Sequence, residues 1–114
     1  MDISIKKDLA SNWFKLLQNA ICDDILKIEK NKVNFESTSW KRSNKKDEGG
    51  GEYRILKSGK IFEKVGVNFS KVYGKFPKQF QKQIPGASKD PTFWASGISI
   101  VMHMQNPHIP AMHF

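Results

Sequence analysis

All three histidines of the chain, His103, His108 and His113, lie within its last twelve residues. Imidazole is the side chain best suited to proton transfer near neutral pH, and in its neutral form it binds metal ions. Ser99 lies four positions before His103, so a strand through both would place a hydroxyl and an imidazole on one face. The cluster indicates proton-transfer or metal-binding chemistry, although clustered histidines are also often ordinary hydrogen-bonded polar residues.

A predicted strand within residues 92–114 must position Ser99 and His103. Bulky apolar residues alternate with them and would form the opposite face of this strand: Ile98, Ile100, Met102 and Met104. An Asn-Pro turn at residues 106–107 precedes a second short strand. If that strand returns antiparallel to the first, it brings His113 close to His103.

Residues 3–29 predict one amphipathic helix. Its apolar side chains recur at spacings of three and four: Leu9, Trp13, Leu16, Leu17, Ala20, Ile21, Ile25 and Ile28. We expect this apolar side to cover one face of a sheet. Cys22 is the only cysteine, which excludes an intramolecular disulfide and favours a small buried hydrophobe on the helix.

The middle of the chain predicts strands. Residues 33–42 mix aromatic and β-branched types and favour a strand, followed by a charged, glycine-ending segment, 43–51, that predicts a flexible loop. The β-rich runs 53–57 and 60–65 flank a Ser-Gly pair and predict a hairpin. Gly66 interrupts the second run and indicates a bulge or a close backbone approach.

Residues 76–86 predict a short helix that begins with one proline and ends at a Pro-Gly pair. Phe76 and Phe80 are four positions apart, so we expect them on one buried helix face. Together, the order of elements predicts an α+β domain with an antiparallel sheet flanked by helices.

The chain has 114 residues, enough for one small domain, and a formal net charge of +8, which favours anionic partners. It contains neither a signal peptide nor an apolar run of membrane-spanning length, so we expect a cytoplasmic protein without a membrane span. Lysines alternate with aromatic residues in 71–83, so a basic nucleic-acid-binding module without catalytic activity is the alternative function. No recognised RNA- or DNA-binding motif supports it, and nucleotide-binding glycine motifs are absent too.

Two long segments resemble, in the correct order, the oxygen-dependent coproporphyrinogen III oxidases. Residues 49–74 are similar to the family pattern V-L-x-x-G-x-V-F-E-K-A-G-V-N-x-S with its preceding glycine-rich loop. Residues 90–114 are similar to F-x-A-x-G-(I/V)-S-x-V-x-H-P-x-N-P-x-(V/I)-P-x-x-H. Two long motifs in order are more specific than any three-residue signature, and the resemblance extends from about Trp40 to Phe114.

The resemblance implies an incomplete version of that family's fold, in which helices cover a flat antiparallel sheet and the enzyme is a homodimer. It implies oxidative decarboxylation of coproporphyrinogen III to protoporphyrinogen IX in haem synthesis, with O2 as the electron acceptor and no organic cofactor. Ser99 matches a substrate-contacting serine, His103 a ligand of a divalent metal, and His113 the proton donor and a further metal ligand. For His103, a hydrogen bond that orients a carboxylate is the alternative role.

Two departures from the family pattern affect the expected activity. Met104 replaces the proline after the first histidine, and the sequence stops at Phe114, before the family's N-x-R motif, its later His, Asp and Arg positions and its C-terminal dimerisation segment. Arginine is the group best matched to a propionate through bidentate hydrogen bonds. We therefore expect a truncated partial domain, 1–114, that is inactive alone or depends on a separate C-terminal chain.

Overall fold

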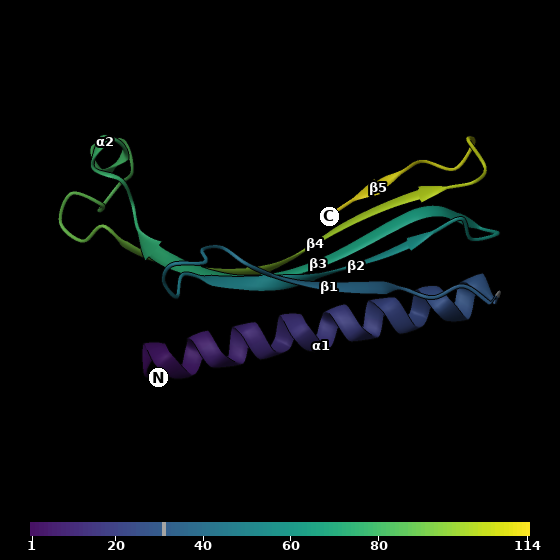
Figure 1. The fold of residues 1–114 in the computed structure, drawn as a ribbon, viewed down its shortest axis with the longest axis horizontal. Helices are drawn as coiled ribbons and strands as arrows, with labels where there is room; N and C mark the ends of the chain where they lie inside the picture. Colours follow the sequence, from purple (N-terminus) through teal and green to yellow (C-terminus); the bar gives the residue numbers. More distant parts are fainter. Residues whose placement is uncertain (31) are drawn as a thin grey trace.

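The computed structural model describes residues 1–30 and 32–114, which form one long helix beneath a five-stranded antiparallel sheet (Figure 1). The elements are α1 (Ile3–Glu29), β1 (Glu36–Lys41), β2 (Gly49–Lys57), β3 (Phe62–Lys75), α2 (Lys78–Gln81), β4 (Thr92–Met104) and β5 (Met112–His113). The strands follow one another across the sheet in sequence order. This architecture confirms the predicted α+β class with an antiparallel sheet.

Helix α1 has the predicted bounds, and both of its ends are capped. At the start, the Asp2 carboxylate accepts a 3.1 Å hydrogen bond from the backbone N–H of Ser4. At the end, Lys30 adopts a left-handed conformation with φ 54°, and its N–H donates to the carbonyl of Leu26. These local bonds explain why the helix begins and ends where it does.

The side of α1 that lies on the sheet coincides only in part with the predicted apolar side, of which Ile25 is buried and Ile21 packs against the core. The buried residues of the helix are Ser11, Gln18, Cys22, Ile25 and Glu29. Four residues of the predicted apolar side are more than half exposed: Leu9 57%, Trp13 56%, Leu16 59% and Ile28 52%. Gln18 can be buried beneath the sheet because its amide donates 3.0 Å hydrogen bonds to the carbonyls of Glu52 and Val67.

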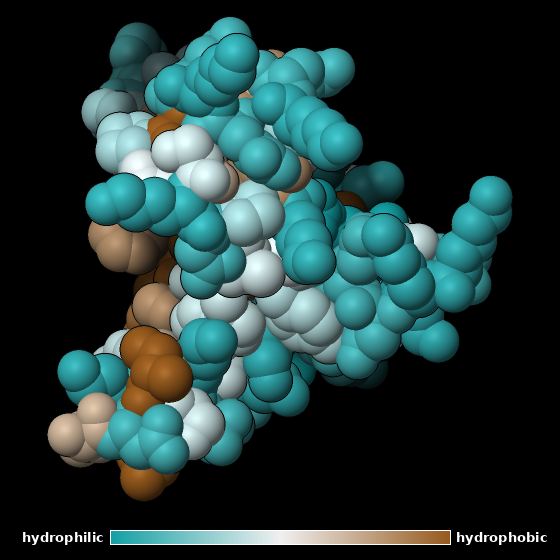
Figure 2. Space-filling view, turned by 90° about the vertical axis from the view of Figure 1, so that its left-hand side faces the viewer, coloured by the Kyte–Doolittle hydropathy of each residue, from teal (hydrophilic) through white to brown (hydrophobic). Residues whose placement is uncertain are grey.

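The exposed apolar side chains lie along the outer side of α1. Figure 2 views the molecule from the end at which the helix begins, and apolar surface is visible at the bottom of this view, where α1 starts. Met1, Ile3 and Ile5 are at least half exposed there. The remaining surface in this view is mostly hydrophilic. The outer side of the helix therefore carries exposed apolar residues, whereas the side that faces the sheet buries polar residues as well as Cys22 and Ile25.

The core lies between α1 and the sheet. Its buried members are Cys22, Ile25, Leu56, Phe62, Val65, Val67 and Ile100. Burial raises the pKa of the Cys22 thiol, because a thiolate is poorly solvated there. The prediction that Cys22 is a small buried hydrophobe is confirmed.

The glycine-rich segment corrects one prediction. The strand predicted at 33–42 is present but shorter, whereas the glycines predicted to end a flexible loop, Gly49–Gly51, begin β2. A Cβ on Gly50 would collide with the Trp40 carbonyl, and one on Gly51 with the Phe69 carbonyl. These glycines are needed for close approach of neighbouring strands, so they do not indicate flexibility.

The predicted hairpin is confirmed as β2 and β3, and α1 holds its turn. The buried carboxylate of Glu29 accepts hydrogen bonds from the backbone N–H groups of Lys60, Ile61 and Phe62. A Cβ on Gly59 would lie 2.7 Å from that carboxylate, so glycine leaves it room. The end of the helix is thereby joined to the turn of the hairpin.

The prediction of a bulge or a close backbone approach at Gly66 is wrong. Gly66 sits in a regular ladder opposite Ile55 and Val101, and the register irregularity of β3 lies instead between Phe62 and Lys64. A glycine within a strand sequence therefore does not by itself indicate a bulge, because it can also occupy a regular position in the ladder.

The short helix is α2, which ends at Gln81 before the predicted Pro-Gly stop. Its aromatic residues share no buried face. Phe76 precedes the helix and stacks on Phe93 with ring centroids 4.7 Å apart, whereas Phe80 is 44% exposed. A single helical turn beyond the sheet has no layer beneath it to cover such a face (Figure 1).

Candidate functional site

The two faces of the sheet differ, because α1 covers one and leaves the other open (Figure 1). Along β4, Ile100 is 3% exposed and packs in the core with Ile98 and Met102, whereas Ser99 and His103 are exposed. The predicted alternation of this strand is therefore confirmed. It puts the hydroxyl and the imidazole together on the open face.

His113 reaches the same face through β5. This strand pairs antiparallel with β4 and places His113 opposite Val101. The Nε2 atoms of His103 and His113 are 3.4 Å apart, with ring centroids at 5.6 Å and planes tilted by 39°. At this distance a neutral pair can share one hydrogen bond, with the donor set by the tautomers. His108 lies in the intervening turn, where its backbone N–H donates to the Asn106 side chain.

The next strand, β3, adds residues that the sequence analysis did not single out. Asn68 lies opposite Ser99 in the register, and Lys64 lies opposite His103. Asn68 belongs to the same motif as Gly66, two positions away on the same face of the strand. This period of two was the available signal, and pairing it with β4 required the register of the sheet.

A hollow of about 630 Å³ lies on the open face above these strands. Among its lining residues are Trp40, Tyr53, Lys64, Gly66, Asn68 and His103. Ser99 and His113 lie beside it, opposite Asn68 and Val101, which do line it. A Cβ built on Gly66 or Gly97 would meet no atom within 4 Å, so the open face is bare at both positions. The arrangement offers an open platform with an imidazole pair at one side.

The open face can supply two imidazole nitrogens to a divalent metal, through His103 and His113. The part of the chain that the structure describes contains no group of three or more His, Cys, Asp or Glu side chains arranged to hold a metal. Further ligands would have to come from elsewhere, so this donor set fits a metal only in part. Among the described residues that line the hollow, the charged side chains are those of Lys64 and Glu63, and no arginine is present.

Within residues 1–30 and 32–114, no helix is both long and apolar enough to cross a membrane.

Comparison with known proteins identifies the family. The family model described as coproporphyrinogen III oxidase matches residues 10–114. Oxygen-dependent coproporphyrinogen-III oxidases of Rickettsia felis and Rickettsia akari are 45% and 44% identical to this chain over 116 residues. Each match covers 95% of this chain and 40% of the relative, so the chain spans well under half the length of these relatives. These matches do not favour the nucleic-acid-binding alternative. The chain belongs to the coproporphyrinogen III oxidase family.

Proposed function

We propose that the open face of the sheet is the substrate platform of an oxygen-dependent coproporphyrinogen III oxidase. The observation that carries the proposal is the His103–His113 pair, whose Nε2 atoms lie 3.4 Å apart beside a hollow of about 630 Å³. The proposed reaction is the one that membership in this family supports. It converts two propionates of coproporphyrinogen III into the vinyl groups of protoporphyrinogen IX. Pockets of this size are typical for small molecules.

The chemistry requires a proton donor. When a propionate becomes a vinyl group, its carboxylate leaves as CO2 and its β-carbon loses a hydrogen with two electrons. Dioxygen accepts the electron pair and that hydrogen, and it is released as hydrogen peroxide after taking up one more proton. We assign this proton to the His113 imidazole, because imidazole exchanges protons readily near neutral pH.

The neighbouring residues would orient the substrate. The Ser99 hydroxyl and the Asn68 amide lie opposite each other in the register and would donate hydrogen bonds to a propionate. His103 would hold His113 in position, or would bind a divalent metal together with it, and such an ion would polarise a bound oxygen atom. The Lys64 ammonium adds positive charge to the same side of the platform.

Completion of the site would need further residues. A substrate with four carboxylates calls for bidentate arginine partners, and none lines the hollow among the described residues. The relatives are much longer than this chain. We therefore propose that this chain alone is inactive, and that another polypeptide segment, supplied in cis or by a separate chain, adds the missing groups. A homodimer of the completed enzyme is part of this proposal.

Reconstitution tests the proposal directly. The 114-residue chain is incubated in air with coproporphyrinogen III, alone and together with the part of the Rickettsia felis oxidase that it does not match. Porphyrin products are separated by chromatography after oxidation. We expect protoporphyrin only from the mixture. Turnover by the chain alone would contradict the need for completion. No turnover by a mixture that forms a folded complex would contradict the proposed function.

A further inference from the structure

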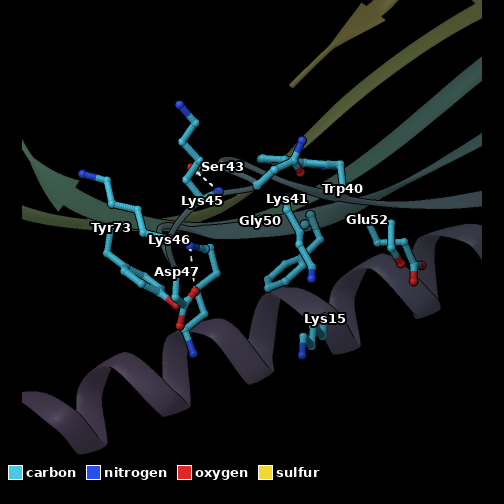
Figure 3. A pocket seen from close by; sticks show the side chains of 16 residues that line it. Lys15, Trp40, Lys41, Ser43, Lys45, Lys46, Asp47, Gly50, Glu52 and Tyr73 are labelled. Atoms are coloured by element: carbon cyan, nitrogen blue, oxygen red, sulfur yellow. Dashed lines mark hydrogen bonds between the residues drawn. The ribbon is translucent and has the colours of Figure 1, made fainter.

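A second hollow, of about 680 Å³, lies on the other side of the sheet, between α1 and the strands β1 and β2. Phe69 and Lys71 contribute to it from β3, and they alternate along that strand with Asn68 on the open face. Figure 3 shows Lys41 extending from β1 toward α1, from which Lys15 projects. We call this space the lysine hollow. It is separated from the histidine pair by the thickness of the sheet.

Positive charge dominates the lysine hollow. Five lysines line it: Lys15, Lys41, Lys45, Lys46 and Lys71. Its two carboxylates are Asp47 and Glu52, and both already have partners. Glu52 is paired with Arg54 at 2.5 Å, and Asp47 accepts a hydrogen bond of 2.5 Å from the Tyr73 hydroxyl.

The lysines differ in how far their charge is compensated. Lys46 forms an ion pair of 3.2 Å with Glu48. Within the described residues, Lys15, Lys41 and Lys71 form no ion pair within 4.0 Å. The ammonium charges of Lys41 and Lys71 still contribute to the lowered pKa of Asp47, after its hydrogen bonds to Tyr73 and Gly49, so both lie near this carboxylate. Lys15, Lys41 and Lys71 therefore line the hollow without an ion pair among the described residues.

The walls of the lysine hollow are held in place by the fold. The Lys15 ammonium lies 5.4 Å from the centre of the Phe69 ring, which is 5% exposed. Gly50 and Gly51 bring the strands so close together that a Cβ would collide with a neighbouring backbone. The Tyr73 ring is fixed by the bond of its hydroxyl to Asp47.

We propose that the lysine hollow binds a small polyanion, a molecule with at least two phosphate or carboxylate groups, through Lys15, Lys41 and Lys71. Ammonium groups form short, charge-assisted hydrogen bonds to both kinds of oxyanion. The volume fits a small molecule, whereas a nucleic acid would need a basic track that continues beyond the hollow. The site lies on the opposite face of the sheet from the histidine pair, and Trp40 lines both hollows.

Calorimetric titration of the 114-residue chain with pyrophosphate and with citrate tests this site. We expect saturable binding of at least one, and the preferred anion distinguishes a phosphate from a carboxylate ligand. The double variant Lys41→Met, Lys71→Met keeps the aliphatic stems and should raise the Kd by about tenfold or more. The matched control is Lys89→Met, an exposed lysine outside the hollow, which should leave the Kd unchanged.

Three outcomes would overturn the proposal. The first is that neither anion binds to a chain whose circular dichroism shows the expected helix and strands. The second is that Lys89→Met weakens binding as much as the double variant does, which would indicate a diffuse surface effect. The third is that a short duplex DNA binds far more tightly than either anion and displaces it. His113→Ala should leave anion binding unchanged, which separates this site from the proposed oxidase site.

Discussion

The chemical role that we assign to His113 depends on where β5 places its side chain. The imidazole is exposed, and β5 contains only two residues. Its position opposite Val101 and next to His103 is what distinguishes it from His108. The chemistry that we assign to this residue therefore rests on geometry. His108, an exposed histidine in the turn before β5, provides the natural comparison.

In the reconstituted enzyme, we expect His113→Ala to reduce kcat by about 10²- to 10⁴-fold, the range for loss of a general acid. The matched control is His108→Ala, which removes another exposed imidazole from the same region and should leave kcat within about twofold of the parent value. Steady-state rates of porphyrin formation give both numbers. Equal losses in the two variants would show that His113 has no special role.

Tyr73 and Asp47 should make stability depend on pH. Their hydrogen bond lowers the pKa of Asp47 from its ordinary 3.8 and raises that of Tyr73 from 10.0. The lowered carboxyl pKa stabilises the fold above pH 3.8, and this stabilisation is lost as the pH falls through the folded-state pKa. The raised phenol pKa stabilises it below pH 10.0, and this stabilisation is lost as the pH rises through the folded-state pKa.

The variant Tyr73→Phe should therefore be less stable than the parent between these limits, and the difference should shrink at both extremes of pH. Urea denaturation at a series of pH values measures the difference. Tyr53→Phe is the matched control, since the Tyr53 hydroxyl has no hydrogen bond within the part of the chain that the structure describes. A difference that stays constant across the pH range would contradict the linkage.

Helix α1 shows what a period can and cannot predict. The spacing of its apolar residues gave its bounds, Ile3–Glu29, because regular spacing of this kind over so many turns fits only a helix. It did not show which side faces the sheet, since Gln18 is buried through bonds to strand carbonyls that are distant in the sequence. The side that packs is decided by these tertiary hydrogen bonds together with the burial of Cys22 and Ile25.

This difference between the two sides of α1 can be measured. Ile25→Ala removes a side chain that is 3% exposed and should lower the free energy of unfolding by about 2–5 kcal/mol. Leu16→Ala makes a similar truncation on the outer side, where Leu16 is 59% exposed, and should change it by about 0.5 kcal/mol or less. Urea denaturation compares the two variants. A larger loss for Leu16→Ala would show that the outer side is the packed one.

The sequence predicts those features of the sheet that depend on one strand alone. The alternation around Ser99 and His103 placed both on one face, and the Asn-Pro turn gave the return of His113. The glycines at 49–51 were misassigned because close approach to Trp40 and Phe69 is a property of strand pairing. For the same reason, the sequence pattern alone does not indicate Asn68, because its place opposite Ser99 is set by the register of β3 and β4.

At the scale of the whole molecule, one face of the sheet is packed and the other is open. The molecule extends 51 × 29 × 28 Å, with α1 running beneath the sheet along the long direction (Figure 1). The packed face contains the core and so accounts for folding. The open face carries the histidine pair and the bare glycine positions, which contribute little packing. Stability and the proposed chemistry are thereby assigned to opposite faces.

Two glycines in neighbouring strands should respond to substitution in opposite ways. Gly66→Val places a β-branched side chain into open space, so we expect an unchanged or higher Tm and loss of coproporphyrin III binding. Gly51→Ala drives a Cβ against the Phe69 carbonyl, and we expect a lower Tm. Thermal unfolding and fluorescence titration with coproporphyrin III give the two readouts. Undiminished binding by a folded Gly66→Val variant would place the substrate elsewhere.

The vacancy above Gly66 has a consequence for how this protein would respond to mutation and selection. A library screened only for cellular abundance would treat the position as permissive, because larger residues find room there and add strand propensity. The same library, screened for haem synthesis in cells that also supply the missing segment of the oxidase, would retain only glycine. Positions at which the two screens differ would identify the residues that contact the ligand. No crystal structure of a complex would be needed for this.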